Sequence, residues 1–127
     1  MTENSGTTYW GLLNATIDGG IAAARADYVR PDQADKLRGS VAGFEACREK
    51  DRYELVALWS DAGAKANQCN GNATIYGEGY WYWRCYQLEV EWVLNVLSAA
   101  LRCSMLSHLP TARGVMRAAE IVGVADD

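Results

Sequence analysis

The stretch that decides the fold is YWYWRCYQLEVEWVLNVLSAAL, residues 80–101. It begins with four large aromatic residues and then becomes almost wholly apolar. At 100° per residue, its polar side chains share one narrow strip of a helix. Such a helix needs neighbours on most of its circumference, so residues 79–105 are expected to form the central hydrophobic helix of a bundle. The strip consists of Arg84, Gln87, Glu91, Asn95, Ser98 and Arg102.

Four further stretches repeat apolar residues with the helical period, and no stretch alternates long enough to predict a strand. The sequence therefore predicts an all-α fold, a compact bundle of about five helices. Residues 8–123 are expected to form a single helical domain between flexible ends at 1–7 and 124–127. The four further helices are predicted at about 8–29, from Pro31 to about Cys47, at about 52–68 and at about 112–122.

Local signals refine these expectations. Asp51 is suited to cap the helix that starts at residue 52, because its carboxylate can accept from free backbone N–H groups. Gly39 and Gly43 lie four residues apart, on one side of their helix, and would let another backbone approach closely. Gly19 and Gly20 fall inside the first helix, where a kink or close packing is expected.

Composition limits the classes of function. The chain has 127 residues, half of them hydrophobic, and a net charge of −4 without a run of cations. A phosphate backbone is bound by clustered cations, so no direct nucleic-acid binding is predicted. The longest apolar window, 90–101, is too short to span a membrane, and no signal peptide is recognisable, so a cytoplasmic location is expected.

No metal, cofactor or catalytic residue is predicted. The four cysteines are 16 to 22 residues apart without a close pair, so buried free thiols are expected and not a zinc site. The single histidine, His108, has no recognisable partner for nucleophilic catalysis. The sequence therefore does not favour an enzyme.

The aromatic start of the central helix is the candidate partner-binding surface. Consecutive helix positions point about 100° apart, so one neighbouring helix cannot cover Tyr80, Trp81 and Trp83 together. Exposed Trp and Tyr beside Arg84 are typical of protein interfaces, including those between two copies of one chain. The alternative is that these rings form core packing under the preceding loop, 70–79.

Glu89 is the candidate centre of a ligand pocket. It points away from the polar strip, in a sector shared with Tyr82 and Tyr86. An unpaired carboxylate there would be costly, so an internal partner is expected, either Arg48, Arg25 or a tyrosine hydroxyl. The functional alternative is a carboxylate poised in a pocket with the two tyrosines, either as an acid or base or as a ligand contact.

Three pieces of the chain carry a resemblance: GFEACR at 43–48, YWRCYQLEVEWVLNVLSAAL at 82–101 and LPTARGVMRAAEIVG at 109–123. They resemble segments of small uncharacterised helical proteins of tailed phages and prophages, and together cover about a third of the chain. The resemblance implies a bacterial host cytoplasm. It implies no assigned activity and no functional residue, but small phage proteins of this size often bind and block a host component, including defence systems such as CRISPR complexes.

These observations favour a small helical interaction protein that binds a protein partner, with a homodimer as one form of that interaction. The alternative is a small-molecule or nucleotide-binding protein, or a minor enzyme, with its pocket around Glu89. A structural component of a virion is a third interpretation, which the lack of extended or repetitive segments disfavours.

Overall fold

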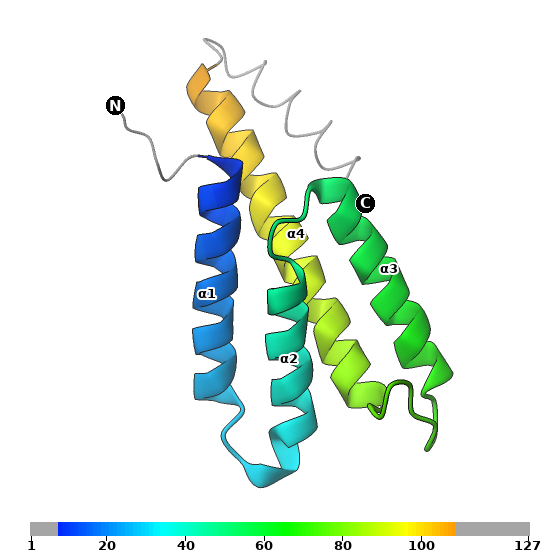
Figure 1. Cartoon of the computed structure of the whole chain (residues 1–127). Helices are drawn as coiled ribbons and strands as arrows, with labels where there is room; N and C mark the ends of the chain where they lie inside the picture. The colour runs from blue at the N-terminus through cyan, green and yellow to red at the C-terminus, as the bar shows by residue number, and fades with distance from the viewer. Residues whose placement is uncertain (1–7, 109–127) are drawn as a thin grey trace.

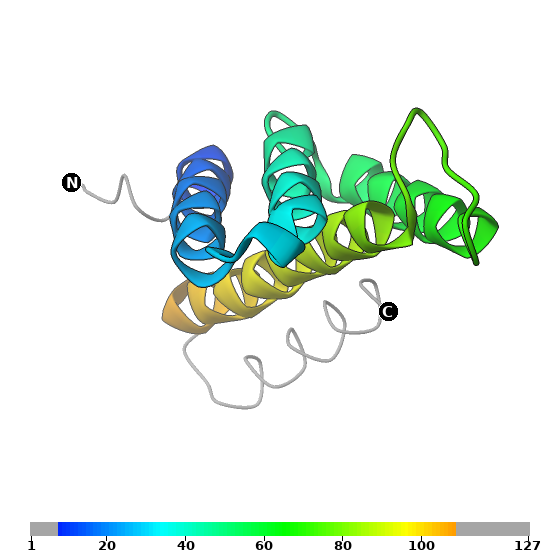
Figure 2. The ribbon, with the colours of Figure 1, turned by 90° about the horizontal axis from the view of Figure 1, so that it is seen from below.

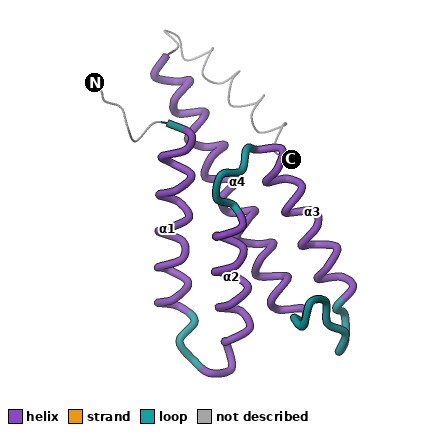
Figure 3. Tube along the Cα trace, viewed as in Figure 1, coloured by secondary structure: helices purple, strands orange, loops and turns teal. Residues whose placement is uncertain are grey.

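The structure, a computed structural model, describes residues 8–108, with side chains as far as residue 102. It contains α1 (Tyr9–Asp27), the short 3-10 turn η2 (Pro31–Gln33), α2 (Ala34–Ala46), α3 (Arg52–Gln68) and α4 (Tyr80–His108) (Figure 1). Residues 8–108 contain no strand, only an isolated bridge between Ile75 and Glu78 (Figure 3). The all-α prediction is confirmed.

Four α-helices are present in the described chain, where about five were expected for the whole protein. The helix predicted at 112–122 and the flexible ends predicted at 1–7 and 124–127 lie outside the described residues. The 8–123 domain therefore stays a prediction beyond residue 108. No helix within 8–108 is both long and apolar enough to cross a bilayer.

The helices form two layers. α1, α2 and α3 lie side by side, and α4 crosses one face of that row and contacts all three (Figures 1 and 2). α4 is therefore the helix that contacts all the other described α-helices, in line with the central position that its sequence predicts. However, the three helices lie on one side of α4, so no described helix covers its opposite side.

Helix starts follow the capping residues. The Asp51 carboxylate accepts from the Glu54 N–H at 2.8 Å, and the Glu54 carboxylate accepts from the Asp51 N–H at 2.9 Å. This reciprocal pair satisfies two N–H groups that α3 itself cannot pair. The predicted cap is confirmed. Pro31 opens η2 and not an α-helix, so α2 begins three residues later, at Ala34.

The core lies between α4 and the layer of three helices. All four helices contribute to it, and Ile17, Phe44, Leu55 and Leu97 are each at most 2 % exposed. Because burying apolar area is the main favourable term in folding, this contact holds the layers together. The full core cluster is Leu13, Ile17, Ile21, Phe44, Cys47, Leu55, Val90, Val93, Leu94 and Leu97.

α2 and α4 touch through their backbones. A Cβ atom at Gly39 would lie 2.2 Å from the Tyr82 carbonyl oxygen, and one at Gly43 would lie 2.7 Å from that of Tyr86. Contacts this short exclude any side chain, so the predicted close approach at both glycines is confirmed. Gly20 is equally tight, with the Phe44 ring 2.2 Å from its would-be Cβ.

The three cysteines whose side chains the structure describes are buried thiols. Cys47, Cys69 and Cys85 are free and buried, as predicted, and Cys103 lies outside those side chains. Burial raises the pKa of Cys47 to about 12, and burial also raises the pKa of Cys85. A nucleophilic thiol needs a lowered pKa, so Cys47 and Cys85 are not suited to nucleophilic chemistry.

Candidate functional site

Trp81 is the exposed ring at the start of α4. Its side chain is 52 % exposed, and the Lys36 ammonium lies 4.5 Å from the ring centroid. The half-buried Tyr80 meets the indole edge-on, with ring centroids 5.0 Å apart. These contacts hold the indole in place without covering it, and a held but uncovered ring is suited to binding a partner.

Trp83 and Arg84 are not free to contact a partner. Trp83 is only 7 % exposed, and its Nε1 donates to the Ile75 carbonyl at 3.2 Å. The prediction that Trp83 is an exposed anchor is wrong, because the loop after α3 folds back over the first turn of α4. Arg84 is half-buried and donates to the Gln87 side chain at 2.5 Å.

The structure separates the three residues of the predicted ligand pocket. Tyr82 and Tyr86 pack with Trp83 in an aromatic cluster, with ring centroids 4.8 Å and 5.4 Å from it. Neither tyrosine lines the cavity that contains Glu89. The predicted grouping is therefore wrong. The reason is that α2, through Gly39 and Gly43, occupies the space next to both tyrosines.

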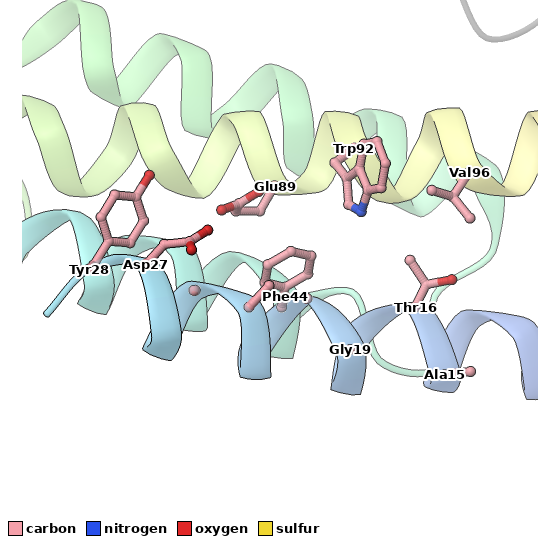
Figure 4. Close-up of a pocket in the computed structure, with 12 residues that line it drawn as sticks. Ala15, Thr16, Gly19, Asp27, Tyr28, Phe44, Glu89, Trp92 and Val96 are labelled. Carbon is pink, nitrogen blue, oxygen red and sulfur yellow. The ribbon is translucent and has the colours of Figure 1, made fainter.

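Glu89 lines a groove between α1 and α4, which we call the α1–α4 groove (Figure 4). Its volume is about 460 Å³, within the usual range for small-molecule sites. One end carries Asp27, Tyr28 and Glu89, while Phe44 and Trp92 lie further along. The α1 wall is built from small residues: Ala15, Gly19, Gly20, Ala23 and Ala24.

The glycine pair Gly19–Gly20 is the sequence signal for this groove. Gly19 and Gly20 were expected to give a kink or close packing, and Gly20 does pack closely on Phe44. Gly19, by contrast, has no neighbouring atom within 4 Å of its would-be Cβ. The two glycines therefore have different roles. Gly20 makes room for the Phe44 ring, whereas Gly19 leaves the groove open.

Glu89 has none of its predicted charged partners. Arg48 instead donates to Glu45 and Asp18, and Arg25 lies exposed on α1. Among the described residues, no side chain forms an ion pair with this carboxylate, and Ser40 on α2 is the hydroxyl close enough to affect its pKa. The Tyr28 hydroxyl is near enough that Glu89 contributes to raising the tyrosine's pKa, although burial is the larger cause.

Burial raises the pKa of Glu89 above its ordinary value of 4.5. The Ser40 hydroxyl opposes this shift, but its Oγ does not reach hydrogen-bonding geometry with any described group, so burial dominates. Losing water disfavours the charged form of a carboxyl group. The groove therefore holds a carboxylate whose charge is not compensated within the described chain.

This shift predicts a pH dependence of stability. Above about pH 4.5 the unfolded chain loses the Glu89 proton while the folded chain still holds it, so raising the pH favours unfolding until the folded group also ionises. Glu89→Gln removes the ionisable group, and with it the loss of stability that accompanies the rise in pH. The variant should gain free energy of unfolding relative to the wild type as the pH rises from about 4 to 7, in urea titrations. A difference that stays constant over this range would contradict the assignment.

A second hollow of about 460 Å³ lies where the beginnings of α1 and α3 meet α4. Trp10 and Tyr53, 51 % and 89 % exposed, stand at its edge. The Tyr9 hydroxyl donates to the Lys50 carbonyl at 2.7 Å, and burial raises the pKa of Tyr9 to about 12. Tyr9 therefore links α1 to the segment just before α3.

Comparisons with protein families, with curated proteins and with solved structures found no match to the chain. No set of three or more His, Cys, Asp or Glu within the described residues is arranged to hold a metal ion. The two candidate sites are both on α4: its exposed outer face and the groove beside Glu89.

Proposed function

We propose that the protein binds another protein through the outer face of α4. Trp81, Leu88 and Trp92 lie seven and four residues apart, so they share one side of the helix. Their side chains are 52 %, 41 % and 54 % exposed. This row of three large apolar side chains, which we call the α4 outer stripe, is the observation that carries the proposal.

The apolar surface of α4 extends beyond the side that the other described helices cover, and this supports the proposal. Gln87 and Ser98, from the polar strip, are buried, and the Glu91 carboxylate accepts from the Trp59 indole of α3 at 3.0 Å. Part of the polar strip thus lies at the contact with α3, while Val90, Val93 and Leu97 of α4 lie in the core and a further apolar row faces outward. A surface helix normally exposes polar side chains to water, so an outward apolar row is a feature that a partner helix or groove can recognise.

The expected partner follows from the chemistry of the stripe. The partner should offer an apolar groove or helix face. It should also carry an acidic group that faces Lys36, which lies beside Trp81. The resemblance to small proteins of tailed phages supports a bacterial host protein, for example a defence component such as a CRISPR complex, and inhibition of it on binding. A second copy of this chain is the other partner that such a face would fit.

Trp81→Ala tests the proposal. The variant should fold with nearly unchanged thermal stability and lose about thirtyfold or more in affinity, because a central Trp in an interface contributes about 2 kcal/mol or more. Proteins captured from bacterial lysate by the wild type, identified by mass spectrometry and titrated as purified proteins, provide the measurement.

Tyr53→Ala is the matched control, because Tyr53 is an exposed aromatic residue on α3 and lies outside the α4 outer stripe. It should keep the captured partner. Sedimentation of both variants tests the homodimer, since a dimer that uses the stripe would dissociate only with Trp81→Ala. Equal retention of the partner by both variants, together with unchanged sedimentation, would overturn the proposal.

A further inference from the structure

The α1–α4 groove combines an acidic end with an apolar body. Asp27, Tyr28 and Glu89 line one end, and none of the described residues that line the groove is a lysine or arginine. Phe44, 2 % exposed, contributes to the apolar part, and the Trp92 indole, 54 % exposed, stands beside it (Figure 4). The polar groups and the apolar surface are thus separated along its length.

The charges of the groove exclude one ligand class and favour another. A nucleotide would bring phosphates toward two carboxylates, so the nucleotide alternative considered from the sequence is disfavoured by repulsion. A cation has the opposite effect, because it would compensate the charge of a half-buried groove carboxylate that forms no ion pair with a described residue. The ligand head group should therefore be positively charged.

The shape of the groove specifies the rest of the ligand. The volume of about 460 Å³ admits a small molecule, and the small α1 residues leave room beside Phe44 and Trp92. Gly19 is the clearest case, with nothing within 4 Å of its would-be Cβ. An aromatic or aliphatic body of modest size would lie against these two rings while its head group reaches Glu89.

We propose that the α1–α4 groove binds a small organic cation, an ammonium or guanidinium group on an apolar body. The cationic group lies between Asp27 and Glu89, and the apolar body lies against Phe44 and Trp92. This binding activity is distinct from the protein binding proposed for the α4 outer stripe, although Trp92 borders both surfaces.

The test uses three probes of similar shape and different charge: 2-phenylethylammonium, neutral 2-phenylethanol and anionic 3-phenylpropanoate. Binding to the full chain is followed at neutral pH by calorimetry and by NMR shifts of the Trp92 indole. Saturable binding of the cation alone is the expected result. Equal binding of the neutral probe, or no saturable binding of the cation, would overturn the proposal.

Two variants locate the site. Glu89→Gln removes the charge and should weaken cation binding about tenfold or more, as expected for a charge-assisted contact. Gly19→Leu keeps the charge and fills the open part of the groove, so it should weaken binding to a similar extent. Circular dichroism and thermal unfolding establish that each variant is folded.

Two control variants distinguish cation binding in the α1–α4 groove from protein binding by the α4 outer stripe. Glu91→Gln removes a carboxylate that contacts Trp59 on the α3 side, and it should leave cation binding unchanged. Trp81→Ala should also leave it unchanged, whatever its effect on a protein partner. Unaltered affinity in both Glu89→Gln and Gly19→Leu would overturn the groove as the site, even if the cation binds elsewhere.

Discussion

Gly39→Ala is expected to lower the free energy of unfolding by about 3 kcal/mol, at the upper end of overpacking effects. Its added methyl group would lie 2.2 Å from the Tyr82 carbonyl oxygen and 2.8 Å from the Tyr82 Cα. Both atoms belong to backbone inside α4, so neither can rotate away as a side chain could. α2 and α4 would have to move apart, and the apolar contact between them would loosen. Urea and thermal unfolding measure the loss, roughly 15 °C for a domain of this size.

Gly19→Ala is the matched control for this prediction. Gly19 is also a helix-interior glycine, but its would-be Cβ meets nothing within 4 Å. Alanine is favoured over glycine in a helix by about 1 kcal/mol, so this variant should be slightly more stable than the wild type. The free energy of unfolding is therefore expected to fall with Gly39→Ala and to rise with Gly19→Ala. If Gly39→Ala were as well tolerated as Gly19→Ala, the close contact between α2 and α4 would be refuted.

Leu97→Ala is expected to cost about 4 kcal/mol, because it removes a side chain that is 2 % exposed and leaves a cavity. Leu97 belongs to the core cluster that joins α4 to the other three helices. Typical domains are stable by only about 5–15 kcal/mol, so this single change should bring the chain near unfolding at moderate temperature. Equilibrium denaturation in urea measures the effect.

Leu88→Ala provides the comparison on the same helix. Leu88 is 41 % exposed on the α4 outer stripe, so its loss should change the free energy of unfolding by less than about 1 kcal/mol. The two substitutions are chemically identical and differ only in the side of α4 that they alter. Similar losses for both would mean that the outer stripe is covered in the protein, which would contradict the proposed binding face.

The boundaries of the elements could be predicted because their signals are local. Asp51 caps a helix that starts at the next residue, and Pro31 marks the start of the second helical segment. Each signal acts on N–H groups or backbone angles within a few residues, so no knowledge of distant contacts is needed. Gly39 and Gly43 likewise indicated a close approach, although not which helix would make it.

The sites were predicted less well because they depend on contacts between distant segments. Tyr82, Tyr86 and Glu89 share a sector of the helical wheel, yet the two tyrosines pack beside Trp83 while Glu89 enters a groove formed with α1. The burial of Trp83 depends on Ile75, in a loop that approaches it only in the folded chain. Of the four predicted partner-binding residues, only Trp81 is mainly exposed.

The sequence alone determined that the described chain is helical, where α1, α3 and α4 begin and which residues of α4 share a side, because periodicity and capping are properties of one segment. Only the tertiary structure decided which side of α4 is buried. Val90, Val93 and Leu97 lie in the core and Gln87 of the polar strip is buried against α3, whereas the apolar row that contains Trp81 and Trp92 faces outward. A helical wheel assigns residues to faces, but burial depends on where α1, α2 and α3 pack, and that is settled by contacts along the whole chain.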